Sequence, residues 1–214
     1  YKDLSGELNV LFDPKFNEDL EFHYKYHENY IFFKFITYSM NTKLISDKYS
    51  QVYDFAINNL SEPLKILEIG GGLPHGLIYN IWKKDKNFLE NFTYVDANLL
   101  HSEFVKWYCE KIKITNDVKL FKPAKTPILE ATKFNFVFAK DIFEHLDAPE
   151  ILIDYLILNT KNNKTLLCLD LEHKGEKIGQ HISPNLPILK ERLVKNNFKV
   201  IKEFKEVHVW KKIN

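Results

Sequence analysis

A run of three glycines directly after a short apolar segment is the feature of this sequence best suited to chemistry on a bound ligand. The segment reads Leu64-Lys65-Ile66-Leu67-Glu68-Ile69, and the glycines are Gly70, Gly71 and Gly72. Glycines at a turn from strand to helix let the backbone approach a ligand closely, and the following helix presents unpaired N–H groups. In open α/β sheets, ligands sit at this carboxyl end of the strands. Taken alone, the loop is also compatible with a tight turn that binds nothing.

An aspartate at the end of the next apolar segment strengthens the case for a ligand site. That segment ends in Tyr94-Val95-Asp96-Ala97. An Asp carboxylate can accept hydrogen bonds from both hydroxyls of a ribose. A lone Asp at a strand end is more often a turn residue. Together with the glycine loop at this spacing, Asp96 predicts a nucleoside site.

These two features resemble motif I and the ribose-binding acid of class I S-adenosylmethionine-dependent methyltransferases. The segment from Phe134 to Leu146, which reads FNFVFAKDIFEHL, is similar to the fourth-strand motif of the same family. Judged by the order of elements, the resemblance runs from Leu64 to the end of the chain. It implies S-adenosylmethionine as the cofactor. The residues expected to contact it are Glu68, Gly70, Gly71, Gly72, Asp96, Ala97, Phe121 and Lys140.

The sequence departs from the family pattern in two places. Pro74 stands where the family carries its third glycine, so the turn near the methionine moiety is expected to be longer or reshaped. No acid follows the third strand in Leu120-Phe121-Lys122 to bind the adenine amino group. We therefore expect adenine to rest against apolar side chains such as Phe121, with backbone atoms reading its edge.

Candidate catalytic residues follow the fourth and fifth predicted strands. Methyl transfer requires the acceptor lone pair to lie in line with the S–CH3 bond, and a base helps when the acceptor is a hydroxyl. We expect His145 or His181 to be that base, with Asp141 beside it. Either histidine is equally compatible with a purely structural or solvated role.

A metal-assisted alternative uses nearly the same residues. Asp141, Glu144, His145 and His181 could bind a divalent ion, in a set similar to the metal site of plant-type small-RNA 2′-O-methyltransferases. That family has a glutamate where this chain has Asp141. We therefore expect catalysis without a metal.

The elements that must position these residues follow from the hydrophobic pattern. Short apolar runs alternate with amphipathic stretches, which predicts an α/β fold: a Rossmann-like, seven-stranded, mostly parallel sheet with an antiparallel last strand and helices on both faces. The predicted strands are residues 65–69, 93–95, 118–121, 134–139, 165–170, 199–204 and 207–210, and the predicted helices between them are 76–84, 100–113, 149–160 and 187–196. The gap around Lys205 and Glu206 is too short for a crossover helix, so the last two strands must pair antiparallel.

The first sixty residues lack this rhythm. They are rich in Phe, Tyr and Asn, with helices expected near residues 20–36 and 43–60. We interpret residues 1–60 as a helical cap within the same domain and residues 61–214 as the methyltransferase core. Aromatic residues such as Tyr24 and Tyr30 are compatible with a lid over the ligands or with ordinary core.

Composition narrows the partners. With 30 Lys plus Arg against 29 Asp plus Glu, the chain has a formal charge of +1 and no field that attracts nucleic acid or membrane. We expect a small-molecule or glycan acceptor, methylated on oxygen rather than nitrogen.

The two cysteines indicate neither a disulfide framework nor a zinc site, and no segment is long and apolar enough to cross a bilayer, which favours a cytoplasmic location. Two alternatives remain: a nicotinamide-dependent oxidoreductase and a methyltransferase-like binding module without turnover.

Overall fold

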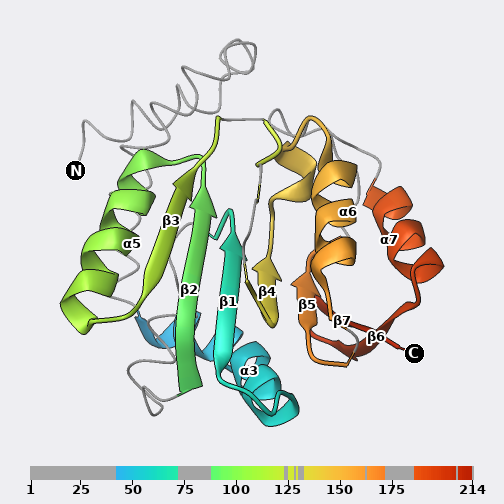
Figure 1. Cartoon of the computed structure of the whole chain (residues 1–214), viewed down its shortest axis with the longest axis horizontal. Coiled ribbons are helices and arrows are strands. Elements are labelled where there is room, and N and C mark those ends of the chain that lie inside the picture. The colour runs from blue at the N-terminus through green and yellow to red at the C-terminus, as the bar shows by residue number, and fades with distance from the viewer. Residues whose placement is uncertain are drawn as a thin grey trace.

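The described part of the chain forms one mixed sheet flanked by helices (Figure 1). The computed structural model describes residues 42–71, 88–122, 125–127, 129, 133–161, 163–171, 186–205 and 207–213. The strands are β1 (Leu64–Ile69), β2 (Leu89–Asp96), β3 (Asn116–Leu120), β4 (Phe136–Ala139), β5 (Leu166–Leu169), β6 (Phe198–Glu203) and β7 (His208–Lys212). The helices are α3 (Thr42–Asn59), α5 (Leu99–Ile112), α6 (Pro149–Asn159) and α7 (Leu186–Lys195), with a single 3-10 turn, η3 (Phe143–His145).

Sheet topology confirms the predicted fold class. The strand order is β3-β2-β1-β4-β5-β7-β6. Neighbouring strands from β3 through β5 are parallel, whereas β7 pairs antiparallel with both β5 and β6. Strand β1 lies between β2 and β4, which is the point where the strand order reverses and where open α/β sheets bind ligands. The carboxyl ends of β1 and β2 lie at the upper edge of the sheet in Figure 1.

Strict alternation along the strands gives the sheet two apolar faces. Even-numbered residues of β1, β4 and β5 pack against α3 and α5. The strand residues are Leu64, Ile66, Phe136, Phe138, Leu166 and Cys168, and the helices contribute Tyr53 from α3 and Val105 from α5, among others. Odd-numbered residues of the same strands pack with α6 and α7, among them Leu67, Val137, Ala139, Leu167, Leu156 and Leu189. Helices therefore cover both faces, as expected for a sheet whose strands are buried on both sides.

Three strands start two or more residues away from the expected position. Strand β2 begins at Leu89, four residues earlier than expected. The polar residues Glu90 and Asn91 near its start conceal the strand pattern in the sequence. Strand β4 begins at Phe136, and the side chain of Asn135 before it accepts from the Lys65 N–H (2.8 Å) and donates to the Pro63 carbonyl (2.8 Å). Edge strand β3 begins two residues earlier than expected, and none of its five residues is fully buried.

Helix α3 confirms the expected helix near residues 43–60. Val52, Tyr53 and Ala56 are buried against the sheet, so this part of the first sixty residues belongs to the core. The expected helices at residues 20–36 and 76–84 lie outside the described residues, and the cap stays a prediction. Within the described ranges, no helix combines the length and the apolarity that a membrane span requires.

Candidate functional site

The glycine turn at the end of β1 depends on its glycines for two separate reasons. Gly70 has a φ of +63°, a left-handed conformation that favours glycine, and its N–H donates to the carbonyl of Val95 on β2 (2.8 Å). A Cβ on Gly70 would lie 2.6 Å from Cδ1 of Ile142. A Cβ on Gly71 would lie 2.2 Å from Oε1 of Glu68. The turn is thus packed between the end of β4 and the side chain that precedes it.

Glu68 is a buried carboxyl at the base of this turn. Its residue is 1% exposed, and its Oε2 has no hydrogen-bond partner among the residues that the structure describes. Burial raises the pKa of Glu68 to about 8, with the negative charge of Asp96 adding to the shift. Glu68 is therefore mostly protonated near neutral pH.

Asp96 ends β2 with its carboxylate held from two sides. The backbone N–H of Asn98 donates to Oδ1 (2.8 Å), and the hydroxyl of Tyr94 donates to Oδ2 (2.6 Å). The residue is 7% exposed. A carboxylate has about four lone-pair sites and can accept from several donors at once. Both hydrogen bonds hold the orientation of the carboxylate.

The first turn of α5 completes the surroundings of Asp96. Asn98 caps the helix by accepting from the N–H of His101 (3.1 Å). Nδ1 of His101 lies 3.5 Å from Oδ2 of Asp96, and in the described part of the chain neither ring nitrogen has a hydrogen-bond partner. On the far side, the N–H of Phe121 donates to the Asp96 carbonyl (3.2 Å). Phe121 is half-buried against the core, beside the predicted ribose-binding residue.

The end of β4 carries the predicted catalytic group. Lys140 forms an ion pair with Asp141, which is exposed and adopts a left-handed φ of +50°. His145 ends η3 with its Nε2 3.9 Å from Oε1 of the buried Glu144. Ile142, between them, reaches the glycine turn. The structure therefore brings the fourth-strand motif next to the end of β1, with Asp141 at the surface.

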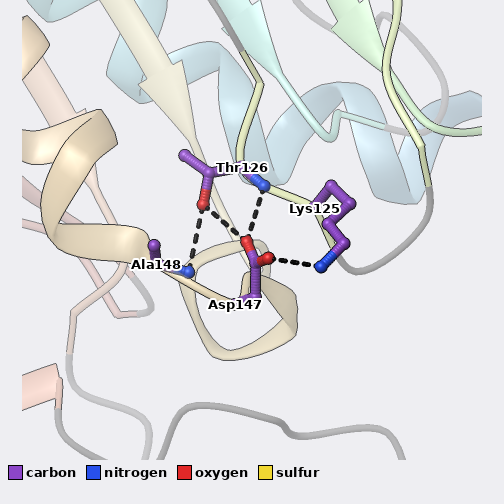
Figure 2. Close-up of polar contacts among 4 residues, drawn as sticks. All are labelled: Lys125, Thr126, Asp147 and Ala148. Atoms are coloured by element: carbon purple, nitrogen blue, oxygen red, sulfur yellow. Dashed lines mark hydrogen bonds and ion pairs between the residues drawn. The ribbon is translucent and has the colours of Figure 1, made fainter.

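A polar network anchors the connection after β3 to the start of α6 (Figure 2). Asp147 accepts from the Lys125 ammonium (2.8 Å) and from the Thr126 N–H (2.9 Å), and the Thr126 hydroxyl accepts from the N–H of Ala148 (3.1 Å). The bond from Lys125, with those from Thr126, holds the pKa of Asp147 below its ordinary value. The network holds Asp147 and Ala148, between η3 and α6, against the segment that contains Lys125 and Thr126.

Two predicted site residues, Gly72 and His181, lie outside the described residues. The metal alternative includes His181, and the described ranges hold no cluster of three or more potential His, Cys, Asp or Glu ligands. Sequence reasoning missed Tyr94, Asn98 and His101. Tyr94 precedes Asp96 by two residues and so shares its face of the strand, and Asn98 is a typical N-cap, so both signals were available.

Comparisons with known proteins find similarity in structure only. No family model matches the chain, and no curated protein matches it in sequence. A SAM-dependent methyltransferase from Aquifex aeolicus aligns with a TM-score of 0.51 at 18% identity, over 79% of this chain and 89% of that one. A chain from the complex between the Haloferax volcanii Trm112 methyltransferase activator and a protein assigned as a methyltransferase aligns with a TM-score of 0.53 at 11% identity, over 80% and 78%.

A third similar structure is named for a different reaction. The [4+2]-cyclase SpnF aligns with a TM-score of 0.51 at 14% identity, over 71% of this chain, and the alignment spans 57% of the cyclase. At these identities the likeness establishes the fold. The chain has the class I fold of SAM-dependent methyltransferases.

Proposed function

We propose that this chain, which has the class I methyltransferase fold, binds S-adenosylmethionine at the carboxyl ends of β1 and β2 and transfers its methyl group to an acceptor. The observation that carries the proposal is the Asp96 carboxylate, buried beside the glycine turn and held by two donors. The strand order places it beside the point where α/β sheets bind nucleotides.

The residues present fit the cofactor. Asp96 supplies acceptors for the ribose hydroxyls, and Phe121 supplies an apolar surface for adenine next to it. Gly70 allows the sharp turn at the end of β1 through its positive φ, and the space beside it is filled by Ile142. Two buried side chains near the Asp96 carboxylate carry polar atoms that have no hydrogen-bond partner among the described residues. These atoms are Oε2 of Glu68 and the two ring nitrogens of His101. When bound, the cofactor supplies an electrophilic methyl group on a sulfonium.

We further propose an oxygen acceptor on a small molecule or glycan, with His145 or His181 accepting the hydroxyl proton and Asp141 beside the fourth strand. An imidazole suits this role because it changes charge near neutral pH. The position of His145 at the end of η3, directly after β4, supports the assignment. Mass spectrometry of the methylated product would identify both the acceptor and the methylated atom.

The direct test of the cofactor proposal is the substitution Asp96→Ala. Loss of a charge-assisted pair of hydrogen bonds should cost on the order of 2 to 3 kcal/mol of binding free energy, which weakens the affinity for S-adenosylmethionine roughly 30- to 150-fold. Isothermal titration measures it. Asp154→Ala is the matched control, because this partly exposed aspartate pairs with Arg192 on the other face of the sheet. Unchanged affinity in a folded Asp96→Ala protein would contradict the assignment.

A further inference from the structure

A buried tyrosine stands directly behind the proposed ribose site. Tyr94 and Asp96 are two residues apart on β2, so their side chains leave the same face of the sheet. Tyr94 is fully buried, and its hydroxyl donates to Oδ2 of Asp96 over 2.6 Å. Burial, followed by the charge of Asp96, raises the pKa of Tyr94 well above its ordinary value. The phenol therefore stays protonated and remains a donor.

The tyrosine is itself held rigidly. Its ring stacks on Phe92, with centroids 6.1 Å apart, and belongs to the cluster that packs the sheet against α3 and α5. The opposite oxygen of Asp96, Oδ1, accepts from the Asn98 N–H at the start of α5. The carboxylate plane is thus fixed by one donor from the core of β2 and one from the helix cap. A group fixed in this way loses little conformational entropy when a ligand binds.

We propose that Tyr94 is a positioning residue for the cofactor ribose, which orients the Asp96 carboxylate so that the ribose diol can donate to it. This inference rests on the proposed function and adds a residue to it. A mobile carboxylate would still attract a hydroxyl, but it would lose orientational freedom on binding. A fixed one favours ligands whose two vicinal hydroxyls match its geometry. Tyr94 therefore acts on the selection of a ribose over a deoxygenated sugar.

Tyr94→Phe tests this role because it keeps the buried ring and removes only the hydroxyl. The probes are S-adenosylhomocysteine and its 2′,3′-dideoxy analogue, each titrated by calorimetry against wild type and variant. The measured quantity is the affinity for S-adenosylhomocysteine divided by the affinity for the dideoxy analogue. We expect Tyr94→Phe to lower that ratio roughly tenfold, with most of the loss in the affinity for S-adenosylhomocysteine. Tyr53→Phe, a buried tyrosine of α3 in the same core cluster, should leave the ratio unchanged.

Each other outcome is decisive. An unchanged ratio in Tyr94→Phe would overturn the inference, because the hydroxyl would then have no effect on the choice of sugar. An increased ratio would also overturn it, because the hydroxyl would then compete with the ribose for Asp96. Equal weakening of both ligands would also overturn it, since a merely structural role acts on both alike. If wild type binds S-adenosylhomocysteine and Asp96→Ala does not, the proposed cofactor site stands whatever Tyr94→Phe shows. If wild type binds neither probe, the proposed function fails and the inference fails with it.

Discussion

At the scale of single residues, two buried carboxyl groups on neighbouring strands differ in their hydrogen-bond partners. Asp96 accepts hydrogen bonds at both oxygens, which stabilises its charge. Glu68 is as deeply buried, lacks a partner for Oε2 among the described residues and faces the charge of Asp96, so its pKa rises to about 8. Glu68 is therefore mostly protonated near neutral pH, which limits the repulsion between the two buried carboxyl groups.

The raised pKa of Glu68 predicts that the free energy of unfolding falls as pH rises through the neutral range. Its ordinary pKa of 4.5 applies to the unfolded chain, and its pKa in the folded protein is about 8. Between these values the unfolded chain releases the proton more readily, so the contribution to stability is full below about pH 4.5 and is lost as pH rises towards 8. Glu68→Gln does not titrate. The variant should gain on the order of a few kcal/mol over wild type between pH 5 and pH 8.5.

Urea unfolding of wild type and Glu68→Gln across this pH range measures the difference, in which the other titrating groups cancel. Glu90→Gln is the matched control: Glu90 lies on β2 but is exposed and pairs with Lys65 at the surface. It should show no comparable pH-dependent gain. A difference between Glu68→Gln and wild type that stays constant with pH would show that Glu68 is ionised in the folded protein.

The sequence predicted part of this residue-scale picture. Asp96 was identified because it ends an apolar segment near the glycine loop, and Glu68 because its segment resembles motif I. The hydrogen bond from Tyr94 was not predicted, since a tyrosine inside a strand is typical of ordinary core. The contact of Ile142 with Gly70 joins residues far apart in the chain, and a single sequence gives no sign of such a pair.

At the scale of elements, the turn after β1 is limited by the side chain that precedes it. Gly71→Ala would place a Cβ against Glu68, whose burial leaves it little room to move. We expect a loss of about 1 to 3 kcal/mol in the free energy of unfolding, typical of overpacking. In a Glu68→Ala background the extra methyl has space, so the same substitution should cost far less.

Denaturant unfolding of the two single variants and the double variant forms a thermodynamic cycle for this contact. Equal costs of Gly71→Ala in both backgrounds would refute the contact between the turn and Glu68. Gly70 is unsuitable for the cycle, because its positive φ adds a backbone cost that removal of a neighbour does not relieve.

Elements were more predictable than contacts. Strands β4 and β5 are buried on both faces and stand out as continuous apolar runs. The link between β6 and β7 is too short for a crossover helix, so their antiparallel pairing could be predicted from its length alone. The start of β2 was missed because polar residues occupy it. The side-chain bonds of Asn135 to the backbone at Pro63 and Lys65 were not predicted either. Local hydrogen-bond partners of that kind do not appear in a hydrophobic pattern.

At the scale of the whole molecule, the part of the chain before α3 carries the remaining prediction about acceptor binding. Helix α3 packs into the core, so a chain that begins at Thr42 keeps every described contact with the sheet. If the preceding residues form a lid, their removal should abolish turnover while the affinity for S-adenosylmethionine changes little. Methyl-transfer assays and calorimetry on the shortened chain measure the two effects. Unfolding of the shortened chain, seen by circular dichroism, would instead assign the segment to the core.

Calorimetric titration of the wild-type protein with S-adenosylmethionine, and in parallel with NAD, tests whether the chain binds the proposed cofactor. The glycine turn and the Asp96 carboxylate both lie at the carboxyl ends of the parallel strands β1 and β2. We expect saturable heat with S-adenosylmethionine at one site per chain and none with NAD, with the S-adenosylmethionine signal strongly reduced in Asp96→Ala. Binding of NAD without binding of S-adenosylmethionine would contradict this expectation and favour an oxidoreductase.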